Sequence, residues 1–121
     1  MNFNYSDIFV AISTNDIQAL TDFYSQLLQK TPDIYRPAIY TEFRLEKLRI
    51  GIFKPKLERQ KEFDNSNSAM SLCFEVEDID MAIATLNDLG SPLGEIIEAS
   101  HGKEIYAYDP AGNRLILHQS K

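Results

Sequence analysis

A pattern that occurs twice along the chain constrains the fold more than any other feature. Alternating apolar residues, the period of a strand with one buried face, occur at Ile8, Val10 and Ile12 and again at Leu72, Phe74 and Val76. Each run is followed by an aspartate, Asp16 or Asp78, and these two lie 62 residues apart. Apolar residues then recur three and four apart, at Ile17, Leu20, Phe23, Tyr24, Leu27 and Leu28 and at Ile79, Ala82, Ile83, Leu86 and Leu89. The repeat predicts two strand-helix pairs, each helix capped by its aspartate.

Each predicted helix is followed by strand-like segments only. The first copy has them at 33–35, 39–45 and 48–53, with Glu46-Lys47 as a tight turn. The second copy begins after Gly90, a C-terminal cap, and has strands at 95–98, 104–108 and 114–118, with turns at 100–103 and 109–112. Both copies therefore read β-α-β-β-β. A ferredoxin-like β-α-β-β-α-β fold is the alternative, but it has only two strands between its helices.

The fold class predicted is α+β, with two such modules in one domain over residues 1–121. Module one covers about 5–54 and module two 70–120. Residues 55–69 between them are polar and charged without apolar periodicity, so they are expected to form a solvated linker. Two modules are expected to share a core, because one small sheet with one helix cannot bury its own face.

Charge and composition exclude several classes of function. Eighteen acidic and twelve basic residues give a net charge of −6, which disfavours nucleic acid and anionic lipid as partners. A lone cysteine, Cys73, excludes an internal disulfide. The first residues do not resemble a signal peptide, and no apolar run approaches the roughly 18 residues of a membrane helix. We therefore expect a cytoplasmic protein that binds neither membrane nor nucleic acid.

Three short motifs resemble those of the vicinal oxygen chelate superfamily, which includes glyoxalase I, bleomycin resistance proteins, fosfomycin resistance enzymes and extradiol dioxygenases. They are Asn15-Asp16-Ile17 with Phe23-Tyr24, then Glu77-Asp78-Ile79-Asp80, and the turn Asp109-Pro110-Ala111-Gly112-Asn113. The similarity extends from Ser6 to Gln119. It implies that the two modules form one cup-shaped mixed sheet, that the protein is a homodimer, and that enzymes of the family hold one divalent metal in the cup.

The residues needed for that metal are missing. The resemblance places the four ligands at Phe9, Gly51, Ser71 and Ile116, and none of these is a usual ligand of a divalent metal. We therefore predict no metal and no cofactor at this position. His101 and His118 are the two histidines of the chain, and a displaced ligand set of His118 with Glu75 remains an alternative.

Strand alternation then predicts which residues face the cup. The predicted ligand-binding set is Phe9, Ala11, Arg49, Gly51, Phe53, Ser71, Cys73, Glu75, Arg114, Ile116 and His118. The opposite face, beneath the helices, carries Ile8, Val10, Ile12, Leu72, Phe74, Val76, Leu115 and Leu117. The alternation does not place Tyr106 and Tyr108. The lining is mixed apolar and polar, as in pockets for small molecules.

Individual members of this set have alternative roles. Arg49 and Arg114 hold matching places and are either a fork for a carboxylate or phosphate or solvated strand ends. Cys73 is either a buried apolar residue or a nucleophile with a lowered pKa. Glu75 serves as a general base only if burial raises its pKa. Phe9 either fills the volume of the missing metal or stacks on a planar ligand.

Three functions follow. The first is a metal-free protein that sequesters a small organic molecule, aromatic or cationic, in the cup. The second is a lyase or dioxygenase-type enzyme, with non-standard metal ligands or with cofactor-independent chemistry through Glu75, His118 or Cys73. The third is an interaction module whose cup is filled by its own side chains, among them Phe9, Phe53 and Ile116. The missing ligands count against an enzyme, and no catalytic residue is assigned.

Overall fold

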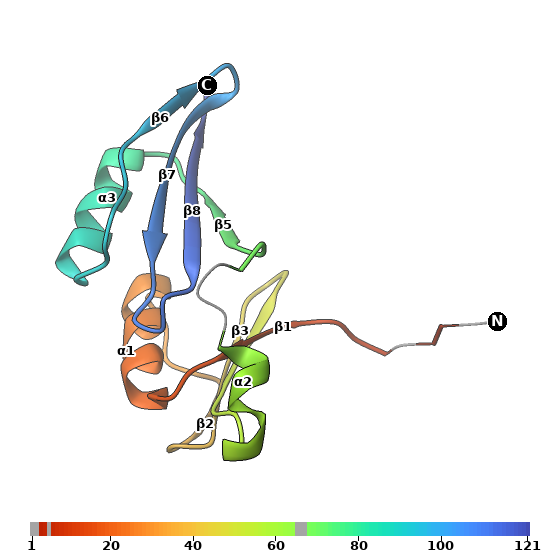
Figure 1. The fold of residues 1–121 in the computed structure, drawn as a ribbon. Helices are drawn as coiled ribbons and strands as arrows, with labels where there is room; N and C mark the ends of the chain where they lie inside the picture. Colours follow the sequence, from red (N-terminus) through yellow and green to blue (C-terminus); the bar gives the residue numbers. More distant parts are fainter. Residues whose placement is uncertain (1–2, 5, 65–67) are drawn as a thin grey trace. The chain divides into compact units, whose positions relative to one another are not determined.

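The chain consists of two copies of one β-α-β-β-β module (Figure 1). The structure, a computed structural model, describes residues 3–4, 6–64 and 68–121, and it divides into two compact units, residues 1–60 and 61–121. The first module contains β1 (Val10–Ser13), α1 (Ile17–Leu28), β2 (Ile34–Arg36), β3 (Tyr40–Arg44) and β4 (Arg49–Phe53). The second contains β5 (Leu72–Glu75), α3 (Ile79–Asp88), β6 (Ile97–Ala99), β7 (Gly102–Tyr108) and β8 (Arg114–Ser120).

Both modules have the same sheet topology. The strand orders are β1-β4-β3-β2 and β5-β8-β7-β6. In each sheet the opening strand pairs in parallel with the last strand, and the other neighbours are antiparallel. The predicted α+β class with paired β-α-β-β-β modules is confirmed, and three strands follow α1 where a ferredoxin-like fold has two.

The two long helices begin at the predicted aspartates. The Asp16 carboxylate accepts a hydrogen bond from the Ala19 amide at 3.0 Å, and the Asp78 carboxylate accepts two from the first turn of α3. Gly90 follows α3 with a φ of +79°, the left-handed conformation expected of a helix-ending glycine. α1 ends instead at Gln29, which adopts a left-handed φ of 54° without being glycine.

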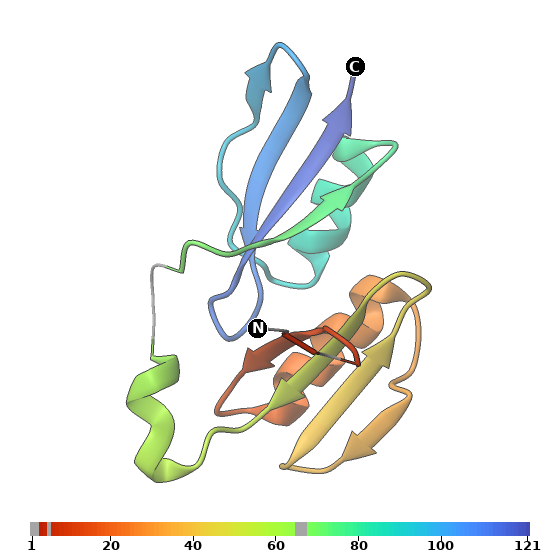
Figure 2. The same cartoon turned by 90° about the vertical axis from the view of Figure 1, so that its right-hand side faces the viewer.

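Each helix covers one face of its own sheet (Figure 2). α1 packs on β3 and β4, and α3 packs on β7 and β8. The fully buried side chains of the first module include Leu20, Tyr24, Phe43, Ile50 and Ile52, and those of the second include Ile79, Leu86, Ala107 and Leu115. One buried polar pair lies among them, because the hydroxyls of Thr21 and Thr41 hydrogen bond at 2.8 Å.

Three local predictions were wrong. Ile8 precedes β1 and is 83% exposed, so it lies in the N-terminal segment and not beneath α1. The turn predicted at 100–103 is shorter, because Ala99 pairs with Gly102 and leaves a two-residue turn. As a result, β6 (Ile97–Ala99) begins two residues later than predicted. β7 begins earlier than predicted, at Gly102.

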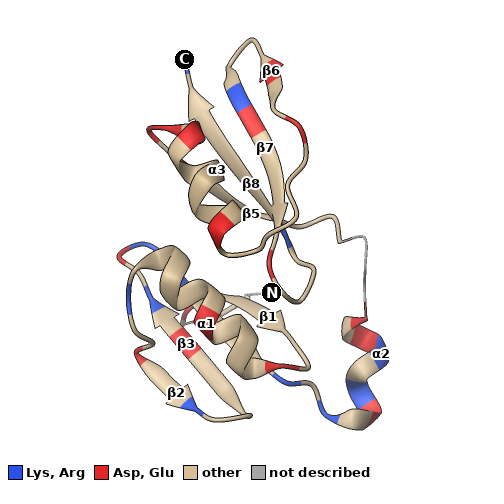
Figure 3. Ribbon diagram, turned by 90° about the vertical axis from the view of Figure 1, so that its left-hand side faces the viewer, with Lys and Arg blue, Asp and Glu red and all other residues tan. Residues whose placement is uncertain are grey.

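The linker contains a short 3-10 helix (Leu57–Arg59) followed by α2 (Gln60–Phe63). Neither has a buried residue, which is why the sequence shows no apolar periodicity there. Figure 3 shows both signs of charge on this segment, as expected of a solvated connection. Tyr5, where the first module was predicted to begin, and residues 65–67 of the linker lie outside the described residues. Among the described residues, no helix is long and apolar enough to cross a membrane.

Candidate functional site

The predicted site residues lie on the sheet faces that the helices leave uncovered, here called the helix-free faces. In the first module, Ala11 and Gly51 are register partners on β1 and β4, and Arg49 and Phe53 flank Gly51 on β4. Their strand neighbours Ile50 and Ile52 are buried on the other face, against α1. Phe9 lies just before β1 and is 44% exposed. The alternation that assigned these strand residues to one face therefore holds in β4.

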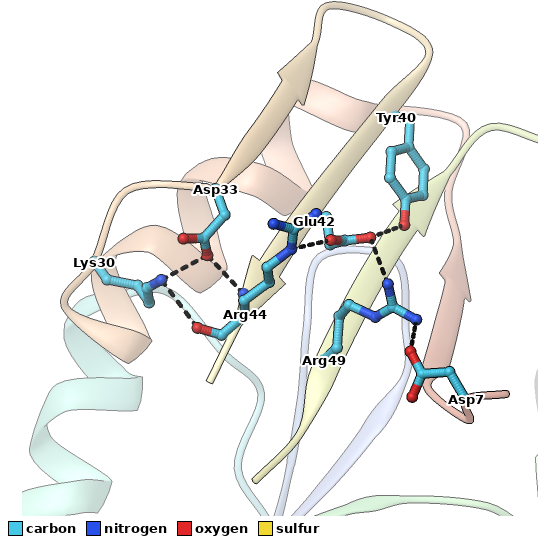
Figure 4. Close-up of polar contacts among 7 residues, drawn as sticks. All are labelled: Asp7, Lys30, Asp33, Tyr40, Glu42, Arg44 and Arg49. Atoms are coloured by element: carbon cyan, nitrogen blue, oxygen red, sulfur yellow. Dashed lines mark hydrogen bonds and ion pairs between the residues drawn. The ribbon is translucent and has the colours of Figure 1, made fainter. Parts of the chain in front are cut away.

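The dominant group on this face is Glu42, which the sequence analysis did not single out. It is the register partner of Gly51 on β3, and only 4% of it is exposed. Its carboxylate accepts a hydrogen bond from the Tyr40 hydroxyl at 2.7 Å and one from Arg44 Nε at 2.6 Å (Figure 4). Arg49 Nη1 lies 3.7 Å away. The tyrosine hydroxyl, followed by the two arginines, lowers the pKa of Glu42, so the carboxylate is ionised at neutral pH.

Arg49 is also held in place by its neighbours. Its guanidinium forms an ion pair with Asp7 and stacks over the Phe9 ring, with Cζ 4.1 Å from the ring centroid. Three groups of the first module therefore share this one cation. Arg49 is neither a solvated strand end nor an open fork for a ligand, and Phe9 stacks on a protein side chain.

Tyr40 occupies the space above Gly51, one of the four positions where the resemblance places a metal ligand. A Cβ built on Gly51 would lie 2.6 Å from the Tyr40 hydroxyl oxygen. Burial, and then the hydrogen bond to Glu42, raises the pKa of Tyr40, so the phenol stays protonated and donates. A ligating side chain at Gly51 would require this tyrosine to move.

The helix-free face of the second module is ordered in rows across β5, β8 and β7. One row, which we call the apolar row, is Cys73, Ile116 and Tyr106. The next, called the acidic row, is Glu75, His118 and Glu104. On the other side of the apolar row, Arg114 pairs with Tyr108. The pairing resolves the placement of Tyr106 and Tyr108, since they face the same side as Ile116 and Arg114.

Arg114 and Ser71 contact each other at the start of this face. Arg114 Nε donates to the Ser71 hydroxyl at 2.7 Å, and Arg114 Nη2 donates to the Ser68 carbonyl at 2.8 Å. The arginine therefore ties the segment that enters β5 to β8. Like Arg49, it already has protein partners, which disfavours the role of an open fork.

The acidic row carries a chain of hydrogen bonds. His118 Nδ1 lies 2.7 Å from Glu75 Oε1, and His118 Nε2 lies 2.8 Å from Nδ1 of His101, which comes from the β6–β7 turn. The Ser120 hydroxyl donates to Glu75 Oε2 at 2.9 Å. His118, and then Ser120, lowers the pKa of Glu75. This is the opposite of the raised pKa that a general base at this position would need.

Cys73 is exposed on β5, one of the two edge strands of its sheet. Partial desolvation of the sulfur raises the pKa of its thiol, and the carboxylates of Glu75 and Glu104 add to that effect. The thiol is therefore protonated at neutral pH, and in the described part of the chain no cation lowers its pKa, as a nucleophile would need. Within the described residues, no group of three His, Cys, Asp or Glu is arranged to hold a metal ion.

The turn that carries the resemblance at Asp109 has a structural role. Asp109 is 3% exposed, and its carboxylate accepts hydrogen bonds from the backbone amides of Ala111 and Asn113 and from the Asn113 side chain. Gly112 supplies a φ of +87°. The motif therefore closes the connection between β7 and β8.

A pocket of about 300 Å³ lies elsewhere, at the start of α1. Its lining is Asn15, Asp16, Ile17, Gln18, Tyr35, Pro37, Ala38 and Lys54. None of the predicted site residues lines it. We regard it as a surface recess of the first module, because its walls are a helix start and the β2–β3 turn and not the helix-free face.

Sequence reasoning missed the residues contributed by β3 and β7. The signal was present, because alternation through the predicted strand 39–45 places Tyr40, Glu42 and Arg44 together, opposite the apolar Phe43. The same reasoning applied to the strand 104–108 would have added Glu104 and Tyr106. Which partners these groups meet depends on strand register, which the alternation does not supply.

Comparison with known proteins agrees with this architecture. Residues 9–118 match the family model described as a glyoxalase-like domain. A glyoxalase-related enzyme from Fulvimarina pelagi superposes with a TM-score of 0.77 at 16% identity, covering 96% of this chain and 89% of that one. A mutant fosfomycin resistance protein from Listeria monocytogenes, crystallised with Mn(II) and 1S,2S-dihydroxypropylphosphonic acid, gives 0.77 at 15% identity, covering 98% and 93%.

A lactoylglutathione lyase from Agrobacterium tumefaciens gives a TM-score of 0.70 at 19% identity, covering 95% of this chain and 94% of that one. No curated protein matches the sequence. At these identities the solved structures establish the fold alone.

Proposed function

Because this chain belongs to the glyoxalase-like domain family, we propose that it binds a small organic molecule on a helix-free face, without the metal centre of the family's enzymes. One observation carries the proposal. The positions that would supply metal ligands hold Phe9, Gly51, Ser71 and Ile116, and Gly51 is covered by Tyr40. Imidazole and carboxylate groups are what such a centre requires, and these four side chains supply neither.

The apolar row of the second module is the surface that best fits such a ligand. Tyr106 is 36% exposed and lies across from Ile116, which Cys73 flanks on the other side. An aromatic ring of a ligand can stack on Tyr106 and cover Ile116. The carboxylates of Glu75 and Glu104 lie in the next row, so a cationic group attached to that ring gains favourable electrostatics. We therefore propose an aromatic cation as the ligand class.

The alternative of cofactor-free catalysis has less support. A nucleophilic Cys73 would need a lowered pKa and a basic Glu75 would need a raised one, and both pKa values move in the opposite direction. The direction of these two pKa shifts therefore favours ligand binding without catalysis.

Thermal melting with matched ligands tests the proposal. The untagged chain is melted with EDTA and a panel of aromatic ammonium compounds, each paired with an uncharged analogue of the same shape. A ligand that binds only the folded state stabilises it by about 2.7 kcal/mol at a hundred times its Kd. We expect the charged member of a pair to raise the Tm more than its neutral analogue.

Two tyrosine variants locate the binding surface. Tyr106→Ala should abolish the Tm shift, whereas Tyr35→Ala, which alters the pocket at the start of α1, should leave it unchanged. Far-UV circular dichroism confirms that each variant is folded. A shift that survives Tyr106→Ala but is lost in Tyr35→Ala would contradict the proposal. So would a shift caused by the organic ligand that appears only when a divalent metal replaces EDTA, beyond the shift that the metal alone produces.

We also propose that the chain forms a homodimer. β1 and β2 are the edge strands of the first sheet, and β5 and β6 those of the second. A second copy can cover such an edge in an isologous pair. Light scattering should give twice the chain mass of 13.8 kDa at all but the lowest concentrations, and a monomer throughout would contradict this.

A further inference from the structure

The chain's two histidines meet on the second module, and we propose that His101 and His118 form a binding site for a borderline divalent transition-metal ion such as Ni²⁺, Zn²⁺ or Cu²⁺. The facing nitrogens, His101 Nδ1 and His118 Nε2, are 2.8 Å apart, and the ring centroids are 4.9 Å apart. This site is distinct from the family's ligand positions, and it uses residues of one module only. It does not depend on the proposed organic ligand.

The backbone holds both histidines at the same end of the sheet. His101 is the second residue of the two-residue turn between β6 and β7, and its carbonyl accepts a hydrogen bond from the Lys121 amide at 3.3 Å. Gly102, the next residue, pairs with Ser120. A Cβ on Gly102 would lie 2.1 Å from the Gln119 carbonyl oxygen, so the turn approaches β8 as closely as glycine allows. The contact between the two rings therefore follows from the strand pairing.

Glu75 orients His118 for metal binding. It is the register partner of His118, and its carboxylate lies 2.7 Å from Nδ1. A carboxylate at this distance holds the proton on Nδ1, which leaves the lone pair of Nε2 directed at His101. Ser120 donates to the same carboxylate and keeps it in place. Histidine ligands of metals characteristically donate their second N–H to such a carboxylate.

Both rings must shift to accept an ion. Two nitrogens at about 2.0–2.1 Å from a tetrahedral ion lie about 3.3 Å apart, so the observed pair must open by about 0.5 Å, and both rings must turn so that their lone pairs converge on the ion instead of facing each other. When the ion binds, Nδ1 of His101 gives up the proton that lies between the two rings. The neutral His101 ring then carries its proton on Nε2 instead. No net proton is released when the ion binds to the neutral pair.

The ligand types and the local charge select the class of ion. Imidazole nitrogens favour Ni²⁺, Cu²⁺ and Zn²⁺ over Mg²⁺ and Ca²⁺. Glu104, the register partner of His118 on β7, adds a second carboxylate to the acidic row. Two protein ligands leave the remaining coordination positions for water or an exogenous ligand.

Calorimetric titration of the full-length, untagged chain with Ni²⁺ alone tests the site. The chain has two histidines, so no other imidazole competes. We expect one ion per chain, and each of His101→Asn and His118→Asn should weaken binding at least about tenfold. Glu75→Gln should also weaken it by about tenfold, through loss of ring orientation. Glu98→Gln, which removes an exposed carboxylate from the same hairpin, is the matched control and should leave the affinity unchanged.

A second measurement keeps the proposal testable if a variant does not fold. Ring-nitrogen NMR of the unmutated chain with Zn²⁺ should show coordination at Nε2 of His118 and Nδ1 of His101. The proposal is overturned if Ni²⁺ binds equally well to His101→Asn or His118→Asn, if the unmutated chain takes up no ion, or if the spectra place the metal on Nε2 of His101. An unchanged affinity in Glu75→Gln would overturn the orienting role of that carboxylate.

Discussion

At the scale of single residues, the helix-free face of the first module is organised around Glu42. The hydroxyl of Tyr40 and the side chain of Arg44 donate to this carboxylate, and Arg49 lies close to it. These partners offset part of the cost of burying the carboxylate, and the same group without them would be strongly destabilising. The charged side chains of this cluster are paired with one another, so they are not available to bind a ligand on this face. This is why the proposed ligand surface lies on the second module.

The steric contact between Gly51 and Tyr40 gives the first prediction. Gly51→Ala should lower the free energy of unfolding by about 2 kcal/mol, because the added methyl group forces Tyr40 away from Glu42. The backbone of Gly51 does not have a positive φ, so the cost is steric. Chemical denaturation measures it.

Tyr40→Phe provides the control for this contact. Removing the hydroxyl removes the atom nearest the new Cβ, while the ring carbons stay 3.1 and 3.2 Å away. The double variant should therefore lose less stability than the two single variants added together. Additive losses, or a neutral Gly51→Ala, would show that Tyr40 does not occupy this space.

At the scale of elements, the aspartate before each long helix defines where the helix starts. Asp78 accepts hydrogen bonds from the amides of Asp80 and Met81, at 3.0 and 3.2 Å. Asp16 accepts one from Ala19 at the start of α1. These bonds satisfy amides that have no partner within the helix. The 62-residue repeat is therefore a repeat of helix starts as well as of apolar faces.

The cap of α3 gives the second prediction. Asp78→Ala should lower the free energy of unfolding by about 1 kcal/mol, through loss of the capping bonds. Asp88, the last residue of α3, is the control. Its replacement by alanine should be neutral or slightly stabilising, because a carboxylate opposes the dipole at a helix C-terminus. Equal effects at the two ends, measured by urea unfolding, would refute a capping role for Asp78.

At the scale of the whole molecule, three carboxylates link stability to pH. Lys30 lowers the pKa of Asp33, Tyr40 and the arginines lower that of Glu42, and His118 and Ser120 lower that of Glu75. A carboxylate with a depressed pKa in the folded state stabilises the protein above its ordinary pKa, which is 4.5 for glutamate. That contribution is lost as the pH falls through the lower, folded pKa.

Acid unfolding provides the third prediction. The free energy of unfolding should fall as the pH drops below about 4.5, because the unfolded chain then binds more protons than the folded one. Glu42→Gln should be less stable than the unmutated chain at pH 7, and the difference should shrink as Glu42 is protonated at low pH. Urea unfolding across this range measures both curves. A constant difference between them would mean that the charge of Glu42 does not stabilise the fold.

The sequence by itself determined the two modules, the starts of both long helices, the strands around Gly51 and Ile116, and the absence of metal-binding side chains at the family's four positions. These features depend on periods of two and 3.6 residues and on caps, which are local along the chain. Local patterns could not show that Tyr40 covers Gly51, that Arg49 is shared by Asp7, Glu42 and Phe9, or that His101 meets His118. Those contacts join residues from different strands and turns, so only strand register and turn length, set by the tertiary structure, decide them.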